Sequence, residues 1–320
     1  MLRKRENIKF RKAVIIGCGL VGSATAFSLM ESGLFEELAL IDSDYKKAEG
    51  EALDISHGVP FSRPIKIYAG NYDEIKDSDI VIITAGANQK DGETRIDLVK
   101  KNIQIFKSII PEIKKRRYQG ILLIVANPVD ILTYVAAKLS GVSKNKVIGS
   151  GTVLDTARLK YEIGRHLDVD SRSVHAFIIG EHGDSEIAVW SSANVSGIPL
   201  NKFCEIRGHF NHEATADKIA NDVKNSAYEI ISMKKATNYG IAMSVKRICE
   251  AIVRNEKSIM PVSTLLNGEY NLKNVSLSIP SIVGKNGVET IIPISLNEKE
   301  TEQLKLSYEK LKKIIEENEL

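Results

Sequence analysis

The sequence feature that most constrains the fold is a glycine-rich turn close to the N-terminus. An apolar run at 13–16 leads into the pattern G-x-G-x-x-G, formed by Gly17, Gly19 and Gly22. Gly17 permits a tight turn, Gly19 lets the backbone approach a pyrophosphate, and Gly22 lets a helix pack closely on a strand. We expect that helix to span 23–32, with its first amide groups facing the phosphate. The pattern predicts a dinucleotide-binding turn between a buried strand and a helix.

An acidic residue follows at the distance that such a turn requires. A second apolar run, 38–41, ends at Asp42, about twenty residues beyond the glycines. A carboxylate at this position holds the ribose hydroxyl groups and repels a 2′-phosphate, so NAD is favoured over NADP. The alternative is a glycine turn in a similar fold that binds a different ligand.

Further apolar runs indicate the fold class. Residues 79–84 and 121–125 are rich in branched aliphatic side chains and show no polar alternation. This composition is typical of parallel strands that are covered on both faces. Strands that alternate with helices predict an α/β, doubly wound Rossmann sheet. Because 320 residues exceed one usual core, we expect an NAD-binding Rossmann domain at 1–150 and a mixed α+β substrate domain at 151–320.

The second half shows a different pattern of elements. Its last helix is expected to begin after Asn297, a good N-cap, with Glu300 completing a capping box. Leu304, Leu311, Ile314 and Ile315 then form one apolar face that we expect to pack on the protein body. Short strands are predicted at 174–180, 186–193, 277–280 and 290–294, and helices at 214–234 and 242–253.

The overall composition excludes several classes of protein. The net charge of +3 is too small for a typical nucleic-acid-binding domain. No segment approaches the length of apolar sequence that spans a bilayer, and none resembles a signal peptide. The cysteines Cys18, Cys204 and Cys249 lack the spacing of a disulfide framework or a zinc site. We therefore expect a cytoplasmic protein without a structural metal.

A histidine between glycine-containing segments is the first candidate for chemistry. His182 lies in the segment 180–184, directly after an apolar strand. Histidine has the side-chain pKa nearest neutrality, which suits proton transfer to a carbonyl oxygen. The alternative is a turn histidine without a chemical role.

Asp155 and Arg158 form a second candidate group. On a helix they are one turn apart and share a face. The simpler interpretation is an ordinary ion pair at the surface. In the functional interpretation the two side chains diverge: Asp155 orients an imidazole, and Arg158 binds a substrate carboxylate with two hydrogen bonds.

A polar loop at 85–95 is the third candidate, because it follows a sheet strand and can close over a ligand to exclude water. The alternative is an ordinary solvated connection. Gly86 in this loop, and Asn127 after the next strand, lie at carboxyl ends of strands, where open α/β sheets bind ligands.

Taken together, these segments resemble the bacterial L-lactate dehydrogenases of the lactate/malate dehydrogenase superfamily. The resemblance covers nearly the whole chain, and the motifs occur in the order and spacing of that family. They are Val14–Gly19, Gly86–Lys90, Gly92–Arg95, Ala126–Asp130, Gly149–Thr152, Leu154–Arg158 and Gly180–Asp184, followed by Lys235–Thr237 and Tyr239–Met243.

The resemblance implies a role for each matching residue. His182 is the acid/base group and is paired to Asp155. Arg158 binds the substrate carboxylate, and Arg95 arrives with the loop and polarises the carbonyl. The residues expected near the substrate also include Gln89, Asn127 and Thr237. Those expected around the cofactor are Gly17, Gly19, Val21, Gly22, Asp42, Lys47, Tyr72, Gly86, Ala87, Asn127, Ser150 and Ile241.

The choice of hydroxy acid depends on the charge at position 89. The related malate dehydrogenases carry arginine where this chain has Gln89. Oxaloacetate brings a second carboxylate, and burying that charge without a partner is costly. Gln89 fits the methyl group of pyruvate, so lactate is the predicted substrate and malate the alternative. A non-catalytic NAD(H)-sensing protein on the same fold is the alternative from another class.

The resemblance also implies partners. It predicts a homotetramer in glycolysis and fermentation, although dimers occur among the relatives. Bacterial relatives often bind fructose 1,6-bisphosphate as an allosteric activator, through an arginine and a histidine. His175 matches the histidine, whereas Lys160 occupies the arginine position. Lysine keeps the charge but lacks the planar geometry that suits phosphate. His175 can instead be a packing residue on a strand face.

Overall fold

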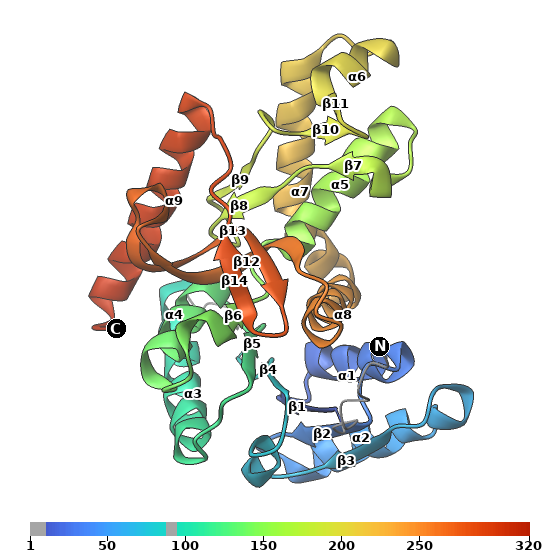
Figure 1. Ribbon diagram of the computed structural model, residues 1–320, viewed down its shortest axis with the longest axis vertical. Helices are drawn as coiled ribbons and strands as arrows, with labels where there is room; N and C mark the ends of the chain where they lie inside the picture. The colour runs from blue at the N-terminus through green and yellow to red at the C-terminus, as the bar shows by residue number, and fades with distance from the viewer. Residues whose placement is uncertain (1–10, 88–94) are drawn as a thin grey trace, which may run out of the picture.

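One long twisted sheet connects the two halves of the protein (Figure 1). The computed structural model describes residues 11–87 and 95–320, and for Arg95 and Ile96 it describes the backbone alone. Within these residues the large sheet has eleven strands, and a second sheet has three. In the same part of the chain, no helix combines the length and apolarity needed to cross a membrane.

The N-terminal half is the predicted doubly wound sheet. Its parallel strands lie in the order β3-β2-β1-β4-β5-β6, which is the strand order of a dinucleotide-binding Rossmann fold. The strands are β1 (Lys12–Ile16), β2 (Glu37–Ile41), β3 (Lys66–Ala69), β4 (Ile80–Ile83), β5 (Ile121–Ile124) and β6 (Val147–Gly149). The helices between them are α1 (Leu20–Ser32), α2 (Tyr45–Ser56), α3 (Arg95–Lys115) and α4 (Val129–Leu139), with short 3-10 turns η1 (Val59–Phe61), η2 (Tyr72–Ile75) and η3 (Lys144–Lys146).

Both faces of the parallel strands are buried, as their apolar composition predicts. Val14 and Ile16 of β1 pack into a core with residues of α3 and α4. Ala13 and Ile15 point to the opposite face, where the core includes residues of α1, α2 and α8 (Tyr239–Val253). This alternation follows from the two-residue period of a strand. It explains why strands covered on both sides carry no polar positions.

The C-terminal half continues the same sheet with antiparallel strands. β12 (Ser258–Asn267) pairs with β6, and β13 (Lys273–Gly284) pairs with β12 and β8 (Ile178–Gly180). The outer strands are β14 (Gly287–Ile291) and β9 (Glu186–Ala188). β7 (Val174–His175), β10 (Asn194–Val195) and β11 (Ile198–Pro199) form the second sheet, near α6 (Leu200–Ile206) at the top of Figure 1. The other helices are α5 (Val153–Leu167), α7 (His212–Lys234) and α9 (Glu298–Glu317), and the remaining 3-10 turns are η4 (Ser171–Ser173) and η5 (Glu269–Asn271).

Several predicted boundaries in this half were wrong. The predicted strand 174–180 is two strands, because β7 pairs with β10 in the small sheet whereas β8 pairs with β13 and β9 in the large one. The predicted strand 186–193 ends at Ala188 for the same reason, since the chain then turns to form β10. β14 ends at Ile291, before Pro293, and α8 begins at Tyr239, three residues before its predicted start.

The C-terminal helix confirms the predicted capping box. The Asn297 side chain accepts a hydrogen bond from the backbone of Glu300, and the Glu300 carboxylate accepts one from the backbone of Asn297. Glu300 is buried and also accepts hydrogen bonds from the amide (3.0 Å) and hydroxyl (2.5 Å) groups of Ser191. The cap therefore holds α9 on the chain that follows β9. Of the predicted apolar face, Leu304, Leu311 and Ile315 are buried in the core, and Ile314 is partly buried against it.

The glycine-rich turn has the geometry that its sequence predicts. Gly17 has φ +106°, a conformation that side chains rarely adopt, and a Cβ there would lie 2.5 Å from the backbone nitrogen of Ala85. A Cβ on Gly22 would lie 1.9 Å from the carbonyl oxygen of Gly17. At Gly19 no atom lies within 4 Å of an added Cβ. Two of the glycines are therefore required by the fold, and Gly19 faces open space.

We predict that Gly22→Ala destabilises the protein by about 2–3 kcal/mol, because α1 must move away from β1 to make room. Gly19→Ala is the matched control. It should cost less than about 1 kcal/mol, since Gly19 is the N-cap of α1 and has negative φ. Urea unfolding of both variants measures the difference. Equal losses of stability would contradict this account of the turn.

Candidate active site

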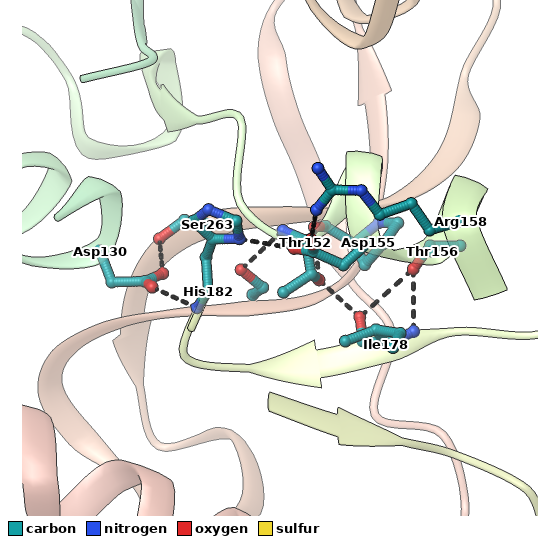
Figure 2. Close-up of polar contacts among 10 residues, drawn as sticks. Asp130, Thr152, Asp155, Thr156, Arg158, Ile178, His182 and Ser263 are labelled. Carbon is teal, nitrogen blue, oxygen red and sulfur yellow. Dashed lines mark hydrogen bonds and ion pairs between the residues drawn. The ribbon is translucent and has the colours of Figure 1, made fainter. Parts of the chain in front are cut away.

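Polar side chains from both halves meet beside the carboxyl ends of the parallel strands. His182 lies in the hairpin loop between β8 and β9, and Asp155 and Arg158 lie on α5. Asp130 lies on the first turn of α4, which follows β5. Figure 2 shows these side chains converging on His182 from opposite sides. The sheet that continues from one half into the other brings them together.

A carboxylate holds the imidazole ring of His182. Nδ1 of His182 lies 2.5 Å from Oδ2 of Asp155. The Asp155 side chain is 2% exposed, whereas the His182 side chain is 24% exposed. Nδ1 therefore faces a buried carboxylate, and this bond requires a proton on Nδ1. Nε2 is then the nitrogen left to exchange a proton with a substrate.

The backbone of the histidine loop is fixed as well. The amide of His182 donates a hydrogen bond to Oδ2 of Asp130 (2.8 Å), and the Ser263 hydroxyl donates one to Oδ1 of Asp130 (2.6 Å). Asp130 and Ser263 are both buried. A carboxylate from the first half and a serine from β12 therefore position a histidine of the second half (Figure 2).

The helix that carries Asp155 is tied to the strand that leads to His182. The Thr152 hydroxyl donates a hydrogen bond to the carbonyl of Ile178 (2.5 Å), and the amide of Ile178 donates one to the Thr156 hydroxyl (2.8 Å). Ile178 is the first residue of β8, so α5 and β8 are held in register. Asp155 lies between the two threonines and consequently faces His182.

Arg158 does not diverge from Asp155 as the functional interpretation of the sequence expected. Its Nη1 lies 2.9 Å from Oδ1 of Asp155, so the two residues form an ion pair one helical turn apart. The pair is not the exposed surface pair of the simpler interpretation either, because the Arg158 side chain is only 14% exposed. Asp155 thus holds the imidazole with one oxygen and the guanidinium with the other.

These contacts set the charges of the site. Burial alone would lower the pKa of His182, but the charge and hydrogen bond of Asp155, with further charge from Asp130 and Glu186, raise it to about 9. Burial opposes ionisation of Asp155, yet His182 and Arg158 hold the pKa of its carboxyl below the usual value. At neutral pH the site therefore contains an imidazolium, a guanidinium and a carboxylate.

Asp155, His182 and Glu186 also form a compact group, with ligand atoms within 4.8 Å of one another. Such a group is close enough to hold a metal ion. Both oxygens of Asp155, however, already bond charged partners. We therefore interpret the group as a proton-transfer site.

The glycine turn and Asp42 form a surface that suits a dinucleotide. Oδ2 of Asp42 accepts a hydrogen bond from the amide of Cys18 (2.7 Å), which places the carboxylate beside the turn. Burial opposes its ionisation, but the amides of Cys18 and Asp44 hold the pKa of Asp42 below its usual value. α1 has no side-chain cap at Gly19, so its first amide groups are left for a phosphate. These residues fit NAD: Asp42 would hold the ribose, and the turn would hold the pyrophosphate.

The loops after β4 and β5 are joined by one buried amide. Oδ1 of Asn102 accepts a hydrogen bond from the amide of Ala87 (2.7 Å), and its Nδ2 donates to the carbonyls of Ala87 (3.3 Å) and Asn127 (2.8 Å). Asn102 lies on α3 and is 2% exposed. It therefore holds two segments that were predicted to contact ligands, including exposed Gly86 and Asn127, at the same edge of the sheet.

The structure places the other predicted cofactor residues along the same sheet. Val21 and Ile241 are partly buried against the core between α1 and α8, and Ser150 is buried at the end of β6. Lys47 is exposed on α2, and its charge acts on Asp42. Tyr72 packs beside the guanidinium of Arg116, 5.5 Å from the ring centre. Their contacts with a cofactor stay predictions.

Two predicted substrate residues lie outside the part of the chain that can be described in full. Gln89 falls in 88–94, outside the described residues, and only the backbone of Arg95 is described, at the start of α3. Thr237 is half-buried between α7 and α8. The roles of these three residues stay predictions.

The residues predicted for an allosteric anion lie away from the histidine loop. Lys160 is half-buried on α5, and His175 is exposed on β7, which packs on α5. The exposure of His175 does not fit the alternative of a packing residue. Burial lowers the pKa of Lys160, and no described carboxylate is ion-paired with it.

The sequence did not identify several residues that build the site. Asp130, Ser263, Asn102 and Glu186 have polar side chains at the site or in its supports. One signal was present: Asn102 interrupts an apolar stripe of α3 that includes Val99, Ile103 and Phe106. A polar residue on a buried stripe requires hydrogen-bond partners. Ser263 had no such signal, because β12 itself was not predicted.

Known proteins match the chain along nearly its full length. The family model of the lactate/malate dehydrogenase NAD-binding domain matches residues 11–149, and that of the α/β C-terminal domain matches residues 152–319. The L-lactate dehydrogenase of Acetivibrio thermocellus is 56% identical, with 97% of this chain and 98% of that protein covered. L-lactate dehydrogenase 1 of Clostridium acetobutylicum is 51% identical, with 96% and 98% covered.

Solved structures agree with these matches. The ligand-bound minor L-lactate dehydrogenase of Enterococcus mundtii has a TM-score of 0.93 at 45% identity, and covers 96% of this chain and 98% of that one. A lactate dehydrogenase from a Medee basin deep-sea metagenome library has a TM-score of 0.94 at 46% identity, and covers 98% and 100%. With the site geometry, these matches show that the chain belongs to the lactate/malate dehydrogenase family.

Proposed function

We propose that the protein catalyses the reversible reduction of pyruvate to L-lactate with NADH. The observation that carries the proposal is the bond between His182 and Asp155, with Arg158 on the other oxygen of the same carboxylate. In this arrangement His182, a proton donor, lies close to Arg158, a cation that can bind a substrate carboxylate. The two relatives that are 56% and 51% identical to this chain are both L-lactate dehydrogenases.

The roles of the residues follow from their charges. Bound NADH supplies a hydride to the carbonyl carbon of the substrate. Protonated His182 donates its proton to the carbonyl oxygen, and Asp155 stabilises the imidazolium before that transfer. Arg158 binds the substrate carboxylate through parallel hydrogen bonds. Arg95, whose backbone begins α3, is proposed to bring positive charge to the carbonyl oxygen. In the oxidation of lactate, neutral His182 accepts the proton.

Pyruvate is preferred over oxaloacetate in this proposal because Gln89 carries no charge. A second substrate carboxylate beside Gln89 would lack a cationic partner, and burying it would be costly. Malate is the corresponding alternative. A non-catalytic NAD(H) sensor would not need His182, Asp155 and Arg158 together, which favours turnover.

The proposal includes a homotetramer in the cytoplasm, with an NAD-binding domain at 1–150 and a substrate domain at 151–320. Large apolar side chains are exposed on α1, α2 and α8, and α1 packs against α8. They include Leu20, Phe27, Leu53 and Met243. Exposed apolar groups on neighbouring helices are typical of a subunit interface. The cysteines are free and buried, which suits a reducing compartment.

Fructose 1,6-bisphosphate is the proposed allosteric ligand, held by Lys160 and His175. Lys160 is half-buried without a carboxylate partner among the described residues, so an anion would offset the cost of its buried charge. His175 is exposed on the strand that packs on α5 and can contribute a second donor.

We predict that kcat/KM for pyruvate exceeds that for oxaloacetate, measured by the loss of NADH absorbance. Gln89→Arg should shift the ratio at least tenfold towards oxaloacetate, since it supplies a partner for the second carboxylate (about 1.4 kcal/mol or more). Gln303→Arg, which adds the same charge to exposed α9, is the control and should leave the ratio unchanged. A native preference for oxaloacetate would contradict the proposed substrate. Absence of turnover with intact NADH binding would favour the sensor.

We also predict that fructose 1,6-bisphosphate lowers the KM for pyruvate, and that Lys160→Met removes this response. Lys313→Met is the matched control, because Lys313 is exposed on α9 and pairs with Glu317. Its response should equal that of the native protein. If the native protein shows no change in KM or kcat with the bisphosphate, the proposed allosteric site is wrong.

A further inference from the structure

A second acidic side chain lies beside the histidine and has no assigned role. Glu186 is the first residue of β9, and it pairs with Gly180 across the hairpin. The hairpin is tight, since the amide of Glu186 donates a hydrogen bond to the carbonyl of Gly183 (3.1 Å). This turn returns the chain to the ring of His182. Glu186 consequently lies within 4.8 Å of ligand atoms of both His182 and Asp155.

The carboxyl group of Glu186 is incompletely paired. Its Oε1 atom is buried and has no hydrogen-bond partner among the described residues. An ionised carboxylate normally accepts several hydrogen bonds when it is buried, because it has lost water. A protonated carboxyl carries no net charge and costs less to bury. The surroundings of Glu186 therefore favour its neutral form.

The charged groups that act most strongly on Glu186 among the described residues come from three parts of the structure. Asp155 and Arg158 lie on α5, His182 lies in the hairpin loop, and Lys224 lies on α7. Burial and the negative charge of Asp155 raise the pKa of Glu186 to about 8, although His182, Arg158 and Lys224 act in the opposite direction. Two carboxyl groups beside one imidazole do not both ionise easily, as in other acidic pairs. At neutral pH, Asp155 carries the charge and Glu186 carries a proton.

We propose that Glu186 is a positioning residue whose protonated carboxyl leaves the positive charge of Arg158 and His182 available to the substrate carboxylate. The inference rests on the proposed function. It adds the proton of Glu186 to the proton that His182 carries. An ionised Glu186 would repel the substrate carboxylate and compete for the same cations. It would also stabilise the imidazolium and weaken His182 as an acid. Substrate capture therefore requires protons on both groups.

The number of protons distinguishes this proposal from one in which His182 titrates alone. With Glu186 losing its proton at about pH 8 and His182 at about pH 9, kcat/KM for pyruvate should fall about tenfold between pH 8 and 9. If His182 alone controls the profile, the fall over that interval is about twofold. Kinetics at saturating NADH measure this difference.

The test compares three variants with the native protein. Glu186→Gln and Glu186→Met remove the titrating carboxyl and should make the fall between pH 8 and 9 smaller than the native fall of about tenfold. The fall stays above about twofold, because the charge of Glu186 also contributes to the raised pKa of His182. Glu289→Gln is the matched control, because it removes one carboxylate that pairs with Lys257 (3.3 Å). It should keep the native profile. NADH affinity, measured for each variant, reports whether the fold is retained.

A measurement on the native protein needs no variant. Oxamate, an isostere of pyruvate, is added to the NADH complex at pH 8.5 in weak buffer, and proton uptake is followed. The proposal predicts uptake of about one proton per site, against about a quarter of a proton if only His182 titrates. Uptake of a quarter of a proton, or an unchanged tenfold fall in both Glu186 variants, overturns the proposal. A native protein that binds NADH without reducing pyruvate at pH 7 would instead overturn the proposed function.

Discussion

The bond between Asp155 and His182 is the interaction around which the rest of the site is arranged. Asp155 is 2% exposed, and a buried carboxylate is tolerated only when charged partners surround it. Here those partners are the imidazole on one oxygen and the guanidinium of Arg158 on the other. Without Asp155, burial would remove the proton from His182. Without His182 and Arg158, Asp155 would be an unpaired buried charge. Asp155 thus keeps the proton on His182, and His182 and Arg158 keep Asp155 ionised, which are the charge states that carbonyl reduction requires.

One sheet runs through both halves of the protein at the site and joins them by hydrogen bonds. β6 belongs to the parallel half and pairs with β12 of the second half. Ser263 on β12 and Asp130 on α4 then fix the backbone of the histidine loop, while Thr152 and Thr156 fix α5 against β8. A substrate that binds here contacts groups from both halves. The cofactor surface at the glycine turn and the proton donor are consequently held by one hydrogen-bonded framework, in which a rotation of one half would break buried hydrogen bonds.

The first half of the fold could be predicted from the sequence because its signals are local. These signals are Gly17, Gly22 and the buried runs that flank them, and each can be interpreted from its neighbours in the sequence. The structure confirms the doubly wound sheet. The second half depends on distant pairing. β12 carries Pro261 and the buried hydroxyl residues Ser263 and Thr264, so it lacks the pattern of a strand, and its partners β6 and β13 alone define it. The same limit applies to Glu186 and Asp130, whose importance follows from the residues that the fold brings beside them.

The most direct test of the central claim is the pH dependence of pyruvate reduction in Asp155→Asn. In the native protein His182 is protonated up to about pH 9 because Asp155 offsets the effect of burial. Its raised pKa means that the protonated form of His182 is present below that pH and is lost above it. Replacing the carboxylate should move the fall in kcat/KM to or below the ordinary histidine pKa of ~6.5, with NADH affinity unchanged. A profile that still falls only above pH 8 in this variant would contradict the claim that Asp155 holds the proton on His182.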